Sequence, residues 1–311
     1  MKSGGTEHPL CSQPTASGIH LQIFFAPKSL PQVLIPYVFA RKTSYGHDNA
    51  RGYKNRNEPS SGRKKVIVGF SSPNIAKDFH AGHLRRTTIG ACTSNLYKCM
   101  GWDVVNMNYL GDWGKQFGLV ALGWQRCNSE ELLERDPLGH LLDVYIRINK
   151  LFKHEKDAVE DAKKRKEDTS QLESQGLYAE RNDFFLRLEA RESEALALWK
   201  RFHDISIPRY ISVYARLNIE FDEYSGESQV DPTTIDKVQS LLTEKGISQM
   251  ENNALINDLE RYGAKNLDTA ILRNRQGTTT YLLRDLAAVL ERAENYDFDK
   301  MIYVVSSEQD V

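Results

Sequence analysis

The sequence lacks several patterns that would place it in a common class of protein. Its 311 residues include four cysteines (Cys11, Cys92, Cys99 and Cys127), and these form neither a C-x-x-C pair nor a Cys/His ligand spacing. We therefore expect reduced, packed thiols, with no metal site and no disulfide framework. The 41 Lys and Arg residues are balanced by 42 Asp and Glu, which leaves a net charge of −1. A nucleic-acid partner would therefore need a local basic patch, because the chain has no overall positive field.

The chain also has no run typical of a membrane span or a secretory signal. Residues 21–40 are apolar, but three prolines and Lys28 disfavour a spanning helix of about 20 residues. Residues 1–20 are rich in Ser, Gly, Thr and Pro, which predicts disorder, and no apolar run follows a basic start. We expect a cytoplasmic protein without a membrane partner. A mitochondrial location is the alternative, because residues 1–20 are also poor in acid.

Residues 66–101 have the pattern of a strand, a loop and a helix. The apolar run Val66–Phe70 predicts a buried strand, and Pro73 prevents regular pairing in the loop that follows. A helix is expected to open at the sequence HAGH and to end at Gly101, since glycine is the common stop residue. The run at 102–109 predicts a second strand, parallel to the first because a helical crossover separates the two.

The two histidines of HAGH lie at the start of the predicted helix, where unpaired backbone N–H groups attract phosphate. His80 and His83 are three residues apart, so both can face one phosphoryl group. Gly82 lets a flat base approach the backbone, and Lys77 adds a mobile cation. Such donors stabilise the charge that develops when a phosphoryl group is attacked. For an H-x-x-H pair alone, two solvated surface histidines are the alternative.

Several longer motifs follow one another along the chain. They are SSPNIAKDFHAGHLR at 71–85, MNYLGDWGKQFG at 107–118, DVYIRINK at 143–150, YSGESQV at 224–230, GTTTYLLRD at 277–285 and FDKMIYVV at 298–305. Together, and in this order over residues 64–311, they resemble arginyl-tRNA synthetases of the eukaryotic kind, with HAGH in place of the HIGH signature of class I aminoacyl-tRNA synthetases.

The resemblance implies an α/β fold, a Rossmann-like parallel-sheet class I synthetase catalytic domain with a mainly helical insertion. Residues 1–20 are expected to be disordered. Residues 21–62 are expected to be the remnant of an appended N-terminal tRNA-contacting domain, followed by a basic linker. Residues 63–311 are expected to form the catalytic domain, incomplete at its C-terminus, with the insertion at about 126–220.

Further elements are expected from local patterns in the second half of the chain. Amphipathic spacing predicts helices at 138–148, 185–202, 232–246 and 285–292, and β-rich runs predict strands at 218–224, 278–282 and 301–305.

The activity implied by the resemblance is that of an arginine–tRNA ligase. Such an enzyme activates L-arginine with ATP to arginyl-adenylate and transfers the arginyl group to tRNA(Arg). ATP enters as a substrate, expected with Mg2+, and no tightly bound cofactor is implied. The expected partners are L-arginine, ATP and tRNA(Arg), and the expected state is a monomer.

The motifs assign residues to these substrates. His80, His83 and Lys77 are the expected catalytic residues, and with Gly82 they are expected to bind ATP. A guanidinium needs carboxylates in planar geometry, so the arginine pocket requires acids. The residues that the resemblance assigns to arginine are Ser72, Asn74, Glu227, Tyr281, Asp285 and Gln309. Asp112, which follows the second strand, either lines the site or is a structural cap.

Two features of the family are absent from the sequence: a lysine-rich KMSKS-like loop after the last strand, and the helical anticodon-binding domain. A catalytically inactive fragment of such a synthetase is therefore the main alternative. A nucleotidyltransferase of the wider HIGH-bearing superfamily and a non-catalytic RNA-binding protein are further alternatives.

Overall fold

The computed structural model describes residues 10–75, 79–165, 167–258 and 269–305. Its centre is a parallel sheet of four strands in the order β11-β5-β6-β7. The strands are β5 (Lys65–Gly69), β6 (Asp103–Leu110), β7 (Glu223–Gly226) and β11 (Lys300–Tyr303). Val66 lies opposite both Val104 of β6 and Lys300 of β11, so β5 is an interior strand. Its apolar side chains are fully buried, as expected for a parallel sheet covered on both faces.

Helix α2 (Ala81–Cys99) connects β5 to β6 and packs on the sheet. It ends at Gly101, whose φ of +78° allows the left-handed turn that stops the helix. Gly90 faces Phe70 so closely that a Cβ at this position would lie 2.2 Å from the Cγ atom of the ring. The strand, loop and helix expected over residues 66–101 are thus found, with the helix against the end of its own strand.

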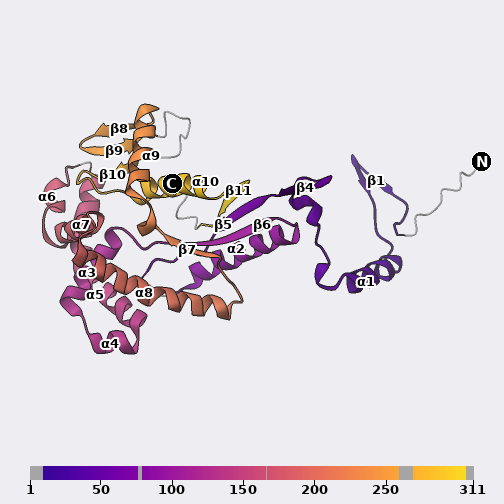
Figure 1. Cartoon of the computed structure of the whole chain (residues 1–311), viewed down its shortest axis with the longest axis horizontal. Coiled ribbons are helices and arrows are strands. Elements are labelled where there is room, and N and C mark those ends of the chain that lie inside the picture. The colour runs from indigo at the N-terminus through magenta and orange to yellow at the C-terminus, as the bar shows by residue number, and fades with distance from the viewer. Residues whose placement is uncertain (1–9, 76–78, 166, 259–268, 306–311) are drawn as a thin grey trace, which may run out of the picture.

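A helical segment lies between β6 and β7 and forms one side of the molecule (Figure 1). Its largest buried side chains are aromatic and form one core, including Phe117, Trp124, Phe185, Phe202 and Tyr210. Its helices are α3 (Lys115–Cys127), α4 (Glu130–Arg135), α5 (Pro137–Lys164), α6 (Ser170–Glu173), α7 (Gly176–Glu189) and α8 (Ser193–Arg216).

After β7 the chain forms a second, smaller layer before it returns to the sheet. A short turn, η3 (Glu227–Gln229), leads to α9 (Pro232–Glu244). The antiparallel strands β8 (Ser248–Glu251), β9 (Ala254–Asn257) and β10 (Ala270–Arg273) follow. Helix α10 (Tyr281–Asn295) packs against α9 and β10 through a separate apolar core and then leads to β11.

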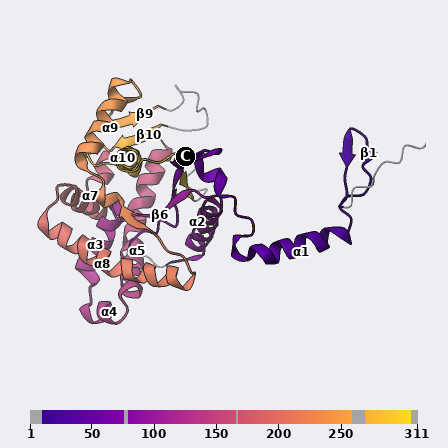
Figure 2. The ribbon, with the colours of Figure 1, turned by 45° about the vertical axis from the view of Figure 1, so that its right-hand side comes forward.

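The first part of the chain extends away from this body as an arm (Figure 2). It contains the hairpin of β1 (Thr15–Ser17) and β2 (His20–Gln22), found where composition predicts no order, and then α1 (Ser29–Arg41). Two short 3₁₀ turns, η1 (Lys42–Ser44) and η2 (Asn49–Gly52), lead to a second hairpin, β3 (Tyr53–Asn55) and β4 (Glu58–Arg63), in the basic linker. In the part of the chain described, no helix is long and apolar enough to cross a membrane.

Three of the expected elements are wrong. The strand expected at 218–224 is β7, which begins only at Glu223, because residues 217–222 are a turn and bend that pack Ile219 and Phe221 against the cores. The strand expected at 278–282 is a loop followed by the start of α10. Pairing with β10 is limited to an isolated bridge between Thr279 and Arg273, because the Thr279 amide bonds Glu189 and α10 begins at Tyr281. The single helix expected at 185–202 is two helices, because the chain reverses at Arg191, where φ is +58°.

The contact between Gly90 and Phe70 gives a test of the packing of α2. On an exposed helix surface, replacing glycine with alanine stabilises by about 0.5–1 kcal/mol. At Gly90 the added methyl group would overlap the ring, so we expect Gly90→Ala to lower the free energy of unfolding by about 1–3 kcal/mol. Urea denaturation measures this change, and Asn95→Ala on the exposed face of the same helix is the control. A Gly90→Ala protein as stable as the wild type would contradict this packing.

Candidate active site at the ends of the parallel strands

The two histidines of HAGH lie against each other at the first turn of α2, and each ring accepts a hydrogen bond from a backbone N–H group there. His80 is the N-cap, and its Nδ1 atom accepts a hydrogen bond of 3.1 Å from the backbone N–H of Gly82. The Nδ1 atom of His83 accepts a bond of 3.3 Å from the backbone N–H of His80, and the ring centroids are 3.9 Å apart. Because Nδ1 accepts, a neutral His80 ring carries its proton on Nε2, where it can donate to a ligand. His83 is buried and His80 is exposed.

The loop after β5 holds the residues expected at the amino end of the arginine pocket. Ser71 and Ser72 have φ values of +71° and +46°, which turn the chain sharply away from the strand. The Ser71 hydroxyl is buried and bonds Tyr214 at 2.7 Å. Asn74 forms a parallel bridge to Gly111, beyond the end of β6, and a Cβ on that glycine would lie 2.1 Å from the Asn74 Oδ1 atom. The loops after β5 and β6 are therefore joined, and they require a glycine to approach this closely.

Asp112, which follows the end of β6, is a buried structural residue. Its side chain accepts bonds of 2.9 Å from the backbone N–H of Ser228 and 2.6 Å from the Ser228 hydroxyl. Burial raises the pKa of its carboxyl, and the bonds to Ser228 and the charge of His203 counteract this. A Cβ on Gly226 would lie 2.5 Å from the Asp112 Oδ2 atom. Asp112 thus fixes the turn on which Glu227 stands, and it does so from behind the expected substrate pocket.

Glu227 forms a buried ion pair with Arg284, which the sequence analysis did not predict. The Nε and Nη2 atoms of Arg284 approach the same carboxylate oxygen, Oε2, at 2.8 and 2.6 Å. Burial raises the pKa of Glu227 to about 7. The charge of Arg284 and its hydrogen bond lower this pKa, whereas Asp285 and Asp112 raise it. The signal for Arg284 was present in the sequence, since it directly precedes Asp285 in the motif GTTTYLLRD.

Asp285 and Tyr281 lie on the first turns of α10. The Asp285 side chain reaches solvent; desolvation raises the pKa of its carboxyl, and the charges of Arg284 and Arg292 counteract this. The ring of Tyr109 at the end of β6 lies under the Arg292 guanidinium, 4.4 Å from its centroid. The pKa of the Tyr109 hydroxyl is raised by burial and by the charges of Asp285 and Glu227. Tyr281 is 61% exposed.

The structure brings some of the expected residues together and leaves others apart. The charge of Asp285 raises the pKa of Glu227, whereas the Asn74 side chain pairs with Gln116, at 3.5 Å. A cavity of about 200 Å3 reaches Glu227, but it extends behind the ion pair toward Glu189 of α7. Of the other expected arginine-binding residues that the structure describes, none lines this cavity. Lys77 and Gln309 lie outside the described residues. Among the residues described, no group of three or more His, Cys, Asp or Glu side chains is arranged to hold a metal ion.

Comparison with known proteins gives consistent matches. The family model described as "tRNA synthetases class I (R), catalytic domain" matches residues 49–311. The cytoplasmic arginine–tRNA ligase of Saccharomyces cerevisiae is 47% identical over 296 residues, which cover 95% of this chain and 45% of the yeast protein. The mitochondrial arginine–tRNA ligase of the same yeast is 41% identical over 98% of this chain and 44% of its own length. The chain belongs to the class I arginyl-tRNA synthetases.

Solved structures agree on the fold. The arginyl-tRNA synthetase of Plasmodium falciparum superposes with a TM-score of 0.62 at 20% identity, over 97% of this chain and 47% of that protein. The Rossmann-like class I fold implied by the motifs is therefore confirmed. This synthetase chain spans about half the length of the curated relatives that it matches. Relatives named as cytoplasmic and as mitochondrial are both present among the matches, so the comparison does not distinguish the two locations.

The raised pKa of Glu227 predicts a pH dependence of stability for this synthetase chain. The folded pKa of about 7 lies above the usual value of 4.5, so the native state binds this proton more tightly than the unfolded state. Wild-type stability should therefore fall as pH rises through this window, and Glu227→Gln should remove that part of the fall. From pH 4.5 to 8 we expect the difference in unfolding free energy to move in favour of Glu227→Gln, by on the order of 3 kcal/mol.

Urea denaturation at several pH values measures this difference, and subtraction of the two proteins removes most of the effect of other groups. Glu192→Gln is the matched control, because Glu192 is exposed and pairs only with Arg187 among the described residues. A difference between wild type and Glu227→Gln that stays constant with pH would show that Glu227 titrates normally.

Proposed function

We propose that this chain carries the arginine- and ATP-binding half of an arginine–tRNA ligase. The reaction is the ATP-dependent formation of arginyl-adenylate from L-arginine, followed by transfer of the arginyl group to tRNA(Arg). The observation that carries the proposal is the pair of acids near the strand ends: Glu227 directly follows β7 and is paired with Arg284, and Asp285, the next residue after Arg284, is exposed on the first turns of α10. Two adjacent carboxylates are what a fixed guanidinium charge requires.

The geometry of the Glu227–Arg284 ion pair is compatible with the binding of a second guanidinium group. The Nε and Nη2 atoms of Arg284 both approach Oε2 of Glu227, and no hydrogen bond to the other carboxylate oxygen comes from the residues described, so we propose that this oxygen is available to a ligand. We propose that this oxygen and the Asp285 carboxylate bind the guanidinium of the substrate, with Tyr281 as a wall. Ser72, Asn74 and Gln309 are proposed to complete the pocket. Arg284 lowers the pKa of Glu227 and so favours the ionised form that the substrate needs.

We propose that ATP binds at the start of α2, to His80, Gly82 and His83 together with Lys77. The backbone N–H groups and the positive end of the helix dipole favour phosphate there. Mg2+ is proposed to arrive coordinated by the phosphates of ATP. The arginine carboxylate would then attack the α-phosphorus and release pyrophosphate. The histidine donors and Lys77 would stabilise the charge on the phosphoryl oxygens.

The direct test is arginine-dependent exchange of pyrophosphate into ATP by the 311-residue protein, with and without tRNA(Arg). Exchange with arginine and not with lysine or citrulline supports the proposed function. Binding of arginine and ATP without exchange would favour the alternative of a catalytically inactive fragment. For location and assembly we propose a cytoplasmic monomer. Import of the protein into isolated mitochondria, or a dimer in sedimentation, would contradict this.

Replacement of Asp285 tests the arginine pocket. Because Asp285→Asn removes one of two charges that would face the guanidinium, we expect arginine binding to weaken by about 10-fold or more, as a charged hydrogen bond is worth roughly 1.5–3 kcal/mol. ATP binding should change by less than about 2-fold, since the phosphate site lies at α2. Calorimetry measures both affinities, and Asp297→Asn, exposed at the other end of α10, is the control. Equal losses for the two ligands would identify Asp285 as a structural cap.

His83 tests the phosphate site, but it also caps α2 through its Nδ1 atom. We therefore compare His83→Ala with His83→Asn, whose amide oxygen can still accept from the backbone. Both should lower the rate of arginyl-adenylate formation by roughly 10²-fold, the effect of one lost transition-state donor. Only His83→Ala should also lower stability, by about 1 kcal/mol. If no adenylate forms, ATP affinity is the readout. An unchanged rate or affinity in His83→Asn would assign His83 to capping alone.

A further inference from the structure

The Glu227–Arg284 pair is held from behind by a relay of hydrogen bonds that begins in the helical segment. The Nη1 atom of Arg284 donates to the carbonyl oxygen and the hydroxyl of Thr279, at 2.9 and 2.8 Å. The backbone N–H of Thr279 donates to the two carboxylate oxygens of Glu189, at 3.2 and 3.3 Å, and the Thr279 hydroxyl also donates to this carboxylate. Glu189 is the last residue of α7 and lies 90 positions before Thr279 in the sequence.

The direction of these bonds requires a carboxylate at position 189. The Thr279 hydroxyl has one proton, and because that proton goes to Glu189, the oxygen lone pairs are turned toward Arg284. A glutamine at 189 keeps one acceptor oxygen and places an NH₂ group near the donors of Thr279. Burial raises the pKa of Glu189, whereas the bonds to Thr279 and the charges of Arg284 and Arg273 lower it. The carboxylate therefore faces donors and cations on the side of the loop.

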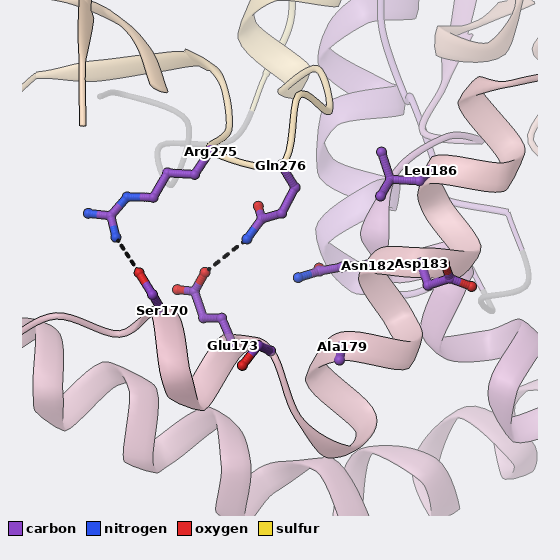
Figure 3. Close-up of a pocket in the computed structure, with 9 residues that line it drawn as sticks. Ser170, Glu173, Ala179, Asn182, Asp183, Leu186, Arg275 and Gln276 are labelled. Atoms are coloured by element: carbon purple, nitrogen blue, oxygen red, sulfur yellow. Dashed lines mark hydrogen bonds between the residues drawn. The ribbon is translucent and has the colours of Figure 1, made fainter. Parts of the chain in front are cut away.

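The same loop, residues 274–280, touches the helical segment at a second place (Figure 3). Arg275 donates to Asp168 at 3.1 Å and to Ser170 at 3.2 Å, and Gln276 donates to Glu173 at 3.4 Å. These contacts lie beside a cavity of about 300 Å3, and the ion pair of Arg275 with Asp168 is exposed, with 43% and 73% of the two side chains accessible. Exposed pairs of this kind contribute little to the fixed position of a loop. The contact between Glu189 and Thr279 is partly buried and consists of three hydrogen bonds to one carboxylate, so it is the firmer of the two attachments.

We propose that Glu189 is a positioning residue for arginine recognition, which holds Thr279 and, through it, orients the Arg284 guanidinium on one oxygen of Glu227. Glu189 touches no substrate atom in this arrangement. Through Glu189, the helical segment contributes to the specificity of the site for its amino acid. If α7 shifted, Arg284 would be free to bond both carboxylate oxygens of Glu227. The role in recognition rests on the proposed function, whereas the orientation of Arg284 does not.

The binding test uses calorimetry on the whole chain with L-arginine and with ATP. We expect Glu189→Gln and Glu189→Ala to weaken arginine binding by about 10-fold, the cost of an interaction worth about 1.4 kcal/mol, and to leave ATP binding within about 2-fold. Thr279→Val, which lacks the hydroxyl, should behave like them, and Thr279→Ser should resemble the wild type. Glu192→Gln, three positions along the chain and paired with Arg187, is the control and should bind both ligands normally.

Hydrogen exchange of the unliganded chain separates this inference from the proposed function. Two segments that are distant in sequence, residues 226–230 and 278–285, should respond in Glu189→Gln and in Thr279→Val. Their backbone amides should exchange at least about 5-fold faster than in the wild type, because loss of the bonds between Glu189 and Thr279 makes local opening more frequent. Thr279→Ser and Glu192→Gln should leave both segments unchanged. Failure of the wild type to bind arginine would refute the proposed function, while this exchange result still decides the role of Glu189. Faster exchange confined to 278–285, or equal loss of arginine and ATP binding, would overturn the positioning role.

Discussion

The candidate site depends on one buried ion pair, that between Glu227 and Arg284. Burial costs each charge its hydration, and the raised pKa of Glu227 shows that the pair only partly recovers this cost. Such a pair stays in place only when further hydrogen bonds satisfy its remaining atoms. The fold supplies them from two directions: Asp112 holds the turn that carries Glu227, and Thr279 with Glu189 holds the guanidinium of Arg284.

The parallel sheet explains why these groups lie at the same edge as the start of α2. The carboxyl ends of parallel strands lie at one edge, so the loops after β5, β6 and β7 converge there. The bridge between Asn74 and Gly111 joins the first two loops, and Asp112 joins the second to the third. At the start of α2 the backbone N–H groups of His80 and Gly82 are bonded to the two histidine rings. These internal hydrogen bonds cap the helix start in the absence of a ligand.

Local patterns predicted the elements whose signals lie close together in the chain. The strand at β5, the helix start at HAGH and the stop near Gly101 are expected from an apolar run, the sequence HAGH and a stop glycine, and all three are found. The failures are cases in which tertiary contacts outweigh local preference. The threonines at 278–280 have strand propensity, but the Thr279 amide bonds Glu189 and α10 begins at Tyr281, so only an isolated bridge to β10 forms. The reversal at Arg191 likewise has no glycine to mark it.

The sequence by itself determined that histidines stand at a helix start and that acids follow later strands, because those features are local. It also determined the family, since several motifs occur in a fixed order. Only the tertiary structure determined which charged and polar side chains pair with one another. Arg284 reaches Glu227 across 57 positions, and Glu189 reaches Thr279 across 90. No periodicity or turn signal encodes such pairings, because they arise from the way the helical segment and the second layer pack around the strand ends.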